Sequence, residues 1–173
     1  VERPGAGDDT RHWGPPFIGG ESGYFLSINR NKKSITVDMS TPEGREIIYR
    51  LARTADVAIE NFRPGTADRL GIGYERLRQE NPSIIYCSIS GFGQTGPYRD
   101  RPGYDALAQA MSGMMAITGE PDGPPMKHGM SIADIGAGMW AVFAIAAALY
   151  HRERTGEGQA IDVSLLDAQL SWL

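Results

Sequence analysis

The sequence has 173 residues, of which 41% are hydrophobic and 22% charged, and its formal net charge is −4. This length fits one domain, and the composition is that of an ordinary globular protein. The net negative charge argues against a nucleic-acid-binding protein, which would carry a basic face, so we expect no nucleic-acid partner. The three histidines are scattered and no CxxC or HExxH pattern occurs, so no metal site is predicted.

The amino-terminal third of the chain begins with loops. Residues 1–33 are rich in glycine and proline and are predicted to be loop-rich. The alternating, β-branched run Ser34–Met39 predicts a strand. Thr41 and Pro42 then have the pattern of a helix N-terminus, and apolar residues at helical spacing predict a helix that lasts to about Thr54.

The next segment alternates strands and helices. Strands are predicted over 56–61 and 83–90, and two short helices between them over Thr66–Leu70 and Tyr74–Glu80, separated by Gly71-Ile72-Gly73. Strands and helices alternating at this spacing predict an α/β fold, with a Rossmann-like parallel sheet and crossover helices.

The second half of the chain is predicted to be mainly helical. Helices are expected over Gly103–Thr118 and from about Ile135 to Arg154, with a turn over Pro121–Pro125 between them and a last strand over Gln159–Ser164. The longest apolar stretch, Met139–Tyr150, is too short to span a bilayer. It therefore predicts a core helix, and no membrane partner is expected.

The single cysteine and the chain ends carry further information. Cys87 lies in an apolar run and is expected to be buried and inert, which is compatible with a reducing compartment. Val1–Pro4 has the character of a strand entering a loop, and the chain stops just after the apolar run Leu165–Leu170. We therefore expect a part of a longer protein.

One glycine-rich segment matches a nucleotide-binding pattern. Gly91–Gly96 reads GxGxxG directly after a predicted strand, as dinucleotide-binding loops do. Such a fingerprint needs a helix that opens at the third glycine, but Pro97 follows and Arg99–Gly103 extends the loop. A mobile loop beside a substrate fits the segment better than a dinucleotide site, and a plain structural loop fits it nearly as well.

Asp134 is the strongest candidate for a catalytic residue. It is an acid isolated among apolar and small residues. One interpretation makes it the N-cap of the following helix. The other makes it a carboxylate nucleophile, which a helix N-terminus and apolar surroundings would suit. The two are compatible, and Gly136 and Gly138 would let a bulky thioester approach the backbone.

Basic residues gather at predicted element ends in the amino-terminal half. Each alone is expected to be a solvated surface charge. As a group they could neutralise the phosphates of an adenine nucleotide. They are Arg3, Arg11, Lys32, Lys33, Arg63 and Arg69.

Several unusual segments follow one another along the chain: Val1–Gly5 with Gly7–Arg11, Asn31–Ile35, Glu60–Gly65, Gly91–Pro97, Gly103–Asp105 and Thr155–Gln159. Together they resemble the class III CoA-transferases over essentially the whole chain. Within that family, Trp13–Phe17 and Asn29–Ile35 are most similar to members that act on succinyl-CoA and glutarate.

The resemblance implies an enzyme that moves CoA from an acyl-CoA donor, such as succinyl-CoA, to a carboxylic acid acceptor, such as the dicarboxylate glutarate. The reaction would pass through an aspartyl-CoA thioester, with Asp134 matching the family's nucleophile. CoA and acyl-CoA enter as substrates, and no permanently bound cofactor is implied. The residues that match positions around CoA are Arg3, Val37, Asn61, Phe62, Arg63, Arg69, Tyr104 and Asp105.

The resemblance also implies an architecture. Residues 1–173 would form part of the large domain of an interlocked homodimer, without its first strand, its small domain and its C-terminal part. The expected compartment is the cytoplasm, or the mitochondrial matrix in a eukaryote.

Two alternative functions stay open. The family contains α-methylacyl-CoA racemases, whose catalytic histidine would fall at Tyr104, and a tyrosine there favours transfer. A module that binds CoA or another nucleotide without chemistry is the second alternative.

Overall fold

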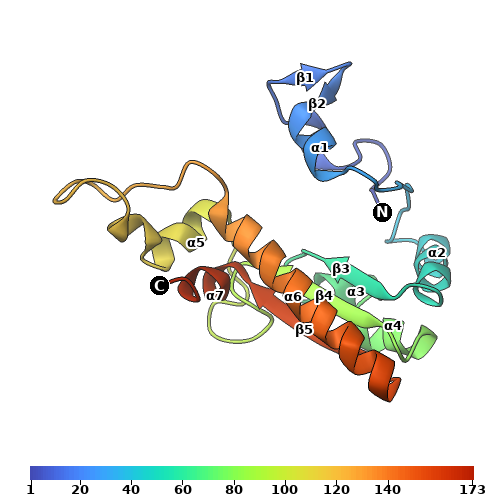
Figure 1. The fold of residues 1–173 in the computed structure, drawn as a ribbon. Coiled ribbons are helices and arrows are strands. Elements are labelled where there is room, and N and C mark those ends of the chain that lie inside the picture. The colour runs from blue at the N-terminus through green and yellow to red at the C-terminus, as the bar shows by residue number, and fades with distance from the viewer. The chain divides into compact units, whose positions relative to one another are not determined.

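The computed structural model describes all 173 residues, which form two compact units, Val1–Ile48 and Tyr49–Leu173 (Figure 1). Each unit is described by itself. The boundary between them falls inside helix α2 (Pro42–Ala52). This helix begins as predicted, because the Thr41 hydroxyl oxygen accepts the Gly44 N–H at 3.0 Å and so caps its first turn.

The first unit consists of short elements joined by loops. The 3-10 helix η1 (Asp9–His12) precedes a hairpin of two-residue strands, β1 (Phe17–Ile18) and β2 (Glu21–Ser22), and α1 (Gly23–Ile28) follows. The Ser22 side chain caps α1 by accepting the Phe25 N–H at 3.2 Å. The prediction of a loop-rich start is therefore confirmed, with these short elements added to it.

The strand predicted over Ser34–Met39 is wrong in its extent. The segment forms one parallel bridge, between Thr36 and Glu2, in which the Glu2 N–H donates to Ile35 O at 2.8 Å and the Val37 N–H donates to Glu2 O at 2.9 Å. A strand needs a partner along its length, and here the pairing segment contributes only Glu2 to the ladder.

The Glu2 carboxylate organises the first unit. Arg11 binds both of its oxygens, each at 2.7 Å, and the Asp8 N–H and the Ser34 hydroxyl also donate to it. The Arg11 guanidinium lies 4.1 Å from the centre of the Phe25 ring. These hydrogen bonds, that from Arg11 above all, hold the pKa of the Glu2 carboxyl far below its usual range.

The second unit is built on a parallel three-stranded sheet in the order β3 (Val57–Glu60), β4 (Ile85–Ser90), β5 (Gln159–Ser164). Between β3 and β4 lie α3 (Thr66–Leu70) and α4 (Tyr74–Glu80). Gly71 ends α3 at φ +75°, a conformation that glycine adopts without strain. The α/β class and the parallel sheet with crossover helices are confirmed.

The long helix expected over Gly103–Thr118 is divided in two. Helix α5 (Asp105–Met111) ends at Ser112, and the 3-10 helix η2 (Met114–Ile117) follows Gly113. Gly113 has a φ of +89°, which no α-helix can contain. The apolar periodicity that predicted one helix runs across this glycine.

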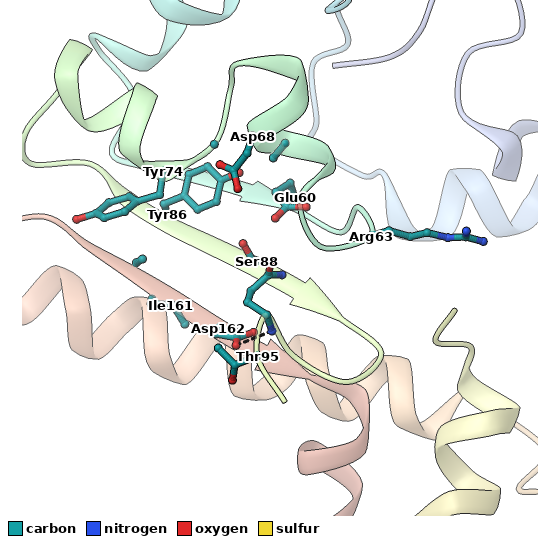
Figure 2. A pocket seen from close by; sticks show the side chains of 14 residues that line it. Glu60, Arg63, Asp68, Tyr74, Tyr86, Ser88, Thr95, Ile161 and Asp162 are labelled. Atoms are coloured by element: carbon teal, nitrogen blue, oxygen red, sulfur yellow. Dashed lines mark hydrogen bonds between the residues drawn. The ribbon is translucent and has the colours of Figure 1, made fainter. Parts of the chain in front are cut away.

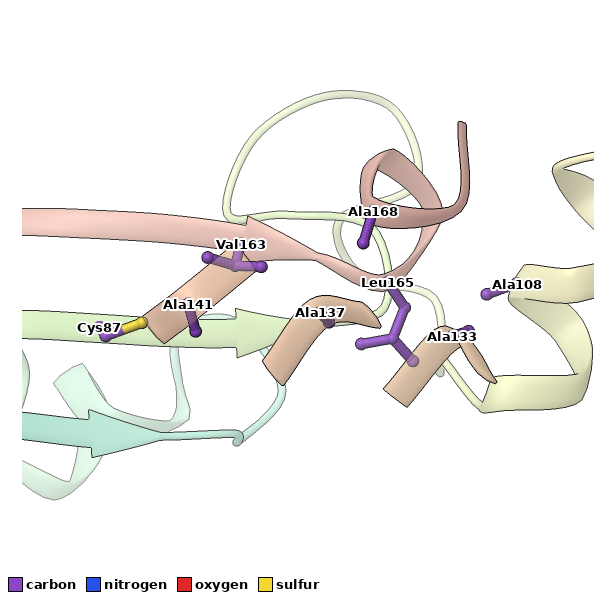
Figure 3. Packing of buried hydrophobic residues seen from close by; sticks show 8 residues of the cluster. All are labelled: Cys87, Ala108, Ala133, Ala137, Ala141, Val163, Leu165 and Ala168. Atoms are coloured by element: carbon purple, nitrogen blue, oxygen red, sulfur yellow. The ribbon is translucent and has the colours of Figure 1, made fainter. Parts of the chain in front are cut away.

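Helix α6 (Ile132–Thr155) returns the chain to the sheet and leads into β5, after which α7 (Leu165–Leu170) follows directly. Alanines four residues apart on one side of α6 belong to the buried core, which Figure 3 shows between α6, the strands and α7. The core residues are Cys87, Ala108, Ala133, Ala137, Ala141, Val163, Leu165 and Ala168. Small side chains let the helix lie close to β4 and β5.

The apolar character of α6 has two interpretations. The helix has 24 residues and begins before the predicted Ile135, so by length and composition alone it could cross a membrane. The helix is therefore longer than the apolar stretch Met139–Tyr150 from which a core helix was predicted. The core helix of a globular protein meets the same criterion, and α6 packs along β4 and β5 as their crossover helix.

Candidate active site

Asp134 lies in the first turn of α6, where it is the third helical residue. It is therefore not the N-cap, which is Ser131, and the Ser131 side chain makes no capping hydrogen bond. The cap comes from another helix instead. The carboxylate of Asp105, the first residue of α5, accepts the Ala133 N–H at 2.8 Å and the Asp134 N–H at 3.4 Å on its Oδ1 atom.

The environment raises the pKa of Asp134. Its side chain is exposed in the chain, but neighbouring atoms partly desolvate the carboxyl group, and this is the larger cause. The nearby carboxylate of Asp105 adds electrostatic repulsion in the same direction. At a given pH, a larger fraction of Asp134 is therefore protonated than of an ordinary aspartate. The side chain is still accessible to solvent and to a ligand.

Asp105 is itself held by a buried glutamine. Gln109, one turn along α5, is completely buried. Its Nε2 donates to Asp105 Oδ2 at 2.6 Å and to the Met130 carbonyl at 3.4 Å, and its Oε1 accepts the His128 N–H at 2.8 Å. Gln109 thus joins α5 to the segment that leads into α6.

The glycine-rich loop Gly91–Gly96 is anchored at the carboxyl end of β4. The Gly93 N–H donates to the Ser90 hydroxyl at 3.0 Å, and the Gln94 N–H donates to Asp162 Oδ2 of β5 at 2.8 Å. The next helix after this loop is α5, which opens only at Asp105. A dinucleotide fingerprint would open a helix at its third glycine, so the loop does not have that geometry.

A cavity of about 330 Å³ lies at the sheet, and its side chains are drawn in Figure 2. Tyr86 and Ser88 of β4 line it, and they alternate with Cys87 and Ile89, which pack toward α6. Successive strand residues point to opposite faces, so the cavity lies on the face away from α6. It contains the acids Glu60, Asp68 and Asp162 and does not include Asp134.

Four of the predicted CoA-contacting residues follow β3 within the second unit. Asn61 and Arg63 are exposed, and Phe62 is half-buried. Arg69 on α3 is exposed and donates to the Thr66 hydroxyl at 3.1 Å. Arg63 lines the cavity, and Figure 2 shows its side chain directed away from the acidic residues. The guanidinium groups are thus open to an anionic ligand.

Two predicted CoA contacts lie in the first unit. Arg3 is exposed and forms an ion pair with Asp9, and its Nε donates to the Gly7 carbonyl at 3.1 Å. Val37 is buried, and its N–H is used in the bridge to Glu2. Arg11, expected as a further phosphate-neutralising cation, binds both carboxylate oxygens of Glu2 instead and also contacts Glu21 at 3.5 Å.

The last two predicted contacts lie together at the start of α5. Tyr104 is 67% exposed, whereas Asp105 is half-buried and both of its oxygens accept hydrogen bonds from the protein. Of the two glycines expected to admit a thioester, Gly138 has open space beside it. A β-carbon on Gly136 would lie 3.2 Å from the Trp172 ring.

The sequence interpretation missed Gln109 and Asp162. Gln109 stands four residues after Asp105, a spacing that brings side chains together on a helix. Asp162 is a carboxylate in the otherwise apolar run from Ala160 to Val163. Both signals were present, but neither says which distant backbone group is the partner.

Comparison with known proteins adds an independent finding. The family model for CoA-transferase family III matches residues 1–173. The chain is 56% identical to a succinate–glutarate CoA-transferase of Agrobacterium fabrum, with 98% of the chain and 44% of the relative covered. It is 54% identical to the succinyl-CoA:glutarate CoA-transferase of Mus musculus, with 100% of the chain and 40% of the relative covered.

A solved structure agrees with these relatives. The fold is similar to the crystal structure of a CAIB/BAIF family protein from Brucella suis, with a TM-score of 0.94 and 53% sequence identity. That match covers 98% of the chain and 46% of the solved chain. The chain thus spans less than half the length of each of these relatives.

Proposed function

The chain belongs to CoA-transferase family III, and on this premise we propose that the whole protein moves CoA from an acyl-CoA donor to a carboxylic acid. The names of its relatives support succinyl-CoA as donor and a dicarboxylate such as glutarate as acceptor. CoA and acyl-CoA are substrates in this proposal, and the protein needs no permanently bound cofactor or metal.

The observation that carries the proposal is the placement of Asp134. An open carboxylate stands in the first turn of a helix beside a second carboxylate, at the sheet edge where the parallel strands end. Ligands of parallel α/β sheets bind at this edge. The positive end of the helix dipole stabilises the anionic, nucleophilic form, which partial desolvation and Asp105 oppose.

In the proposed mechanism, the Asp134 carboxylate attacks the carbonyl of the donor thioester, and the C–S bond breaks to release CoA thiolate and a mixed anhydride. The thiolate then attacks the aspartyl carbonyl, which gives aspartyl-CoA and frees the donor carboxylate. The acceptor carboxylate attacks aspartyl-CoA in turn, forming a second mixed anhydride and thiolate. Thiolate attack on the acceptor's carbonyl releases the new acyl-CoA and restores Asp134.

We assign binding of CoA to the residues found at or near the strand ends. The exposed guanidinium groups of Arg63 and Arg69 suit phosphates, and Arg3 has the same capacity within its own unit. Asn61 and Phe62, which precede Arg63 in sequence, are assigned to the nucleotide, and Val37 of the first unit is assigned to it on the resemblance alone. Tyr104, 67% exposed directly before α5, is assigned to the thioester end.

The proposal includes an assembly and a compartment. A homodimer, interlocked through the parts of the protein outside this chain, would complete the site. The buried, free Cys87 fits a reducing compartment such as the cytoplasm.

The test is made in the full-length enzyme. Asp134→Ala should abolish transfer from succinyl-CoA to glutarate while CoA affinity, measured by calorimetry, stays close to that of the wild type. Hydroxylamine added to wild-type enzyme with succinyl-CoA should leave a hydroxamate at Asp134, visible by mass spectrometry. Asp122→Asn is the matched control, since Asp122 is an exposed acid on the turn before α6.

The same samples separate the alternatives. In deuterated water, 2-methylacyl-CoA should keep its α-hydrogen. Rapid deuterium uptake without an adduct would establish a racemase, and CoA binding with neither reaction would leave only a binding module. Transfer by Asp134→Ala within about tenfold of wild type, a loss of under about 1.4 kcal/mol in transition-state stabilisation, would overturn Asp134 as nucleophile.

A further inference from the structure

A chain of close contacts connects the end of β4 to the backbone of Asp134. It begins at Gly91, which follows β4, and Gly103, which precedes α5. A β-carbon added to Gly91 would lie 2.3 Å from the Gly103 α-carbon, so the two backbones touch without side chains between them. This contact fixes the entry of α5 against the sheet.

The next contacts pass from α5 to α6. Asp105, two residues after Gly103, accepts the N–H groups of Ala133 and Asp134. These amides are 28 and 29 residues away along the chain, so the bonds join two separate elements. The first N–H groups of an α-helix have no acceptor within the helix. Here the Asp105 side chain of α5 provides the acceptor for two of them.

Gln109 holds the second oxygen of Asp105 and also the approach to α6. Its amide is completely buried and bonds Asp105, the His128 N–H and the Met130 carbonyl. A buried polar group that is fully used in this way specifies one arrangement of the backbones around it, because any other arrangement leaves it unpaired. The segment 128–134 is therefore held against α5 at four backbone positions, those of His128, Met130, Ala133 and Asp134.

From this geometry we propose that Asp105 and Gln109 are positioning residues for the transfer reaction, holding the first turn of α6 so that the Asp134 carboxylate meets the thioester carbonyl. Asp105 acts through backbone amides and does not contact CoA, which replaces the position around CoA that the resemblance implied for it. The inference rests on the proposed function of Asp134. It assigns both residues to the step in which the aspartyl adduct forms.

Such a role has a kinetic consequence. A displacement of about 1 Å in a reacting group can lower a rate by about a hundredfold while binding is unaffected. Loss of the Asp105–Gln109 pair should therefore lower kcat and the rate of adduct formation, with little change in CoA affinity.

The experiment uses Asp105→Asn and Gln109→Leu in the full-length enzyme, with Asp122→Asn as the charge-matched control. Both substitutions keep the approximate side-chain volume, and circular dichroism confirms the fold before the kinetics. Stopped-flow quenching with hydroxylamine measures adduct formation from succinyl-CoA, and calorimetry measures CoA affinity. We expect both variants to form the adduct about tenfold to a hundredfold more slowly with CoA affinity unchanged, and the control to match wild type.

A pH profile adds a readout that general loss of structure would not move. Removing the Asp105 charge removes repulsion from Asp134, so the pKa of Asp134 falls and the acid limb of kcat/KM shifts to lower pH in Asp105→Asn. Gln109→Leu keeps that charge, so it should slow adduct formation without the same shift of the acid limb.

The outcomes are distinguishable from those that test the proposed function. If Asp134→Ala is inactive while Asp105→Asn and Gln109→Leu form the adduct at the wild-type rate, the positioning role is wrong and the proposed function stands. If Asp105→Asn weakens CoA binding and keeps the wild-type rate at saturation, Asp105 is a substrate contact. If Asp134→Ala remains active, the proposed function fails, and the positioning role fails with it.

Discussion

The backbones of Gly91 and Gly103 lie against each other so closely that a β-carbon built on Gly103 would be 2.1 Å from the Gly91 α-carbon. The two glycines bracket the loop between β4 and α5. Neither is required for a left-handed conformation, since neither has a positive φ. The absence of a side chain is what the packing requires here.

Gly103→Ala should therefore lower the free energy of unfolding of the full-length protein by about 1–3 kcal/mol, the usual cost of overpacking. Gly138→Ala is the matched control, because nothing lies within 4 Å of its β-carbon position and the residue is helical. It should leave stability unchanged or raise it by up to about 1 kcal/mol. Denaturant titration measures the free energy of unfolding of both variants. Equal changes in the two would show that the contact between Gly91 and Gly103 does not contribute to stability.

The pKa of Asp134 predicts how stability depends on pH. Its folded-state pKa lies above the ordinary value of about 3.9, so ionisation disfavours the folded state as pH rises through that range. Asp134→Asn should therefore melt at a higher temperature than wild type at pH 7, and at nearly the same temperature at pH 3. A wild type more stable than the variant at pH 7 would contradict a raised pKa.

The Asp162 carboxylate should control the mobility of the glycine-rich loop. Asp162→Ala removes the acceptor of the Gln94 N–H, so that amide should exchange with deuterium faster in hydrogen-exchange mass spectrometry. Ser90→Ala should instead release the Gly93 amide, which the Ser90 hydroxyl holds. An unchanged Gln94 amide in Asp162→Ala would mean that the loop is ordered by other contacts.

The Glu2–Arg11 pair should stabilise the first unit at neutral pH and lose that effect in acid. The folded-state pKa of Glu2 is depressed, so its contribution is complete above the ordinary value of about 4.3 and declines as pH falls toward the folded pKa. Glu2→Gln should accelerate exchange of the Val37 N–H, which the backbone of Glu2 binds.

The control for this pair is Glu21→Gln. Glu21 lies 3.5 Å from Arg11 and its side chain is 48% exposed, so its loss should have little effect on Val37 exchange. If both substitutions accelerate exchange of the Val37 N–H equally, the total negative charge around Arg11 protects this amide, and the two-oxygen contact with Glu2 has no specific effect.

Elements with local signals followed from the sequence alone. Helices α3 and α4 were predicted over the residues they occupy, because Gly71-Ile72-Gly73 separates two short helical patterns within a few residues. Strand β5 was predicted over Gln159–Ser164, and α2 by its Thr41 cap. These signals act through neighbouring residues, so they are present in the sequence before any tertiary contact forms.

Candidate site residues were also identifiable in sequence, but their surroundings were not. Asp134 was selected as an isolated acid, and the sequence left open whether it is also the N-cap of the following helix. Its actual place in the first turn depends on Asp105, whose carboxylate caps α6 from a different helix. A residue about 28 positions away leaves no trace in local periodicity.

What the tertiary structure alone decided are the pairings between distant segments. The run Ser34–Met39 has strand composition, yet it pairs at one bridge, because a strand exists only where a partner backbone completes its hydrogen bonds. Arg11 is a residue type that commonly binds phosphate, yet its guanidinium forms an ion pair with both carboxylate oxygens of Glu2. Composition and spacing determined which residues could act, and contacts across the fold determined which of them are free to do so.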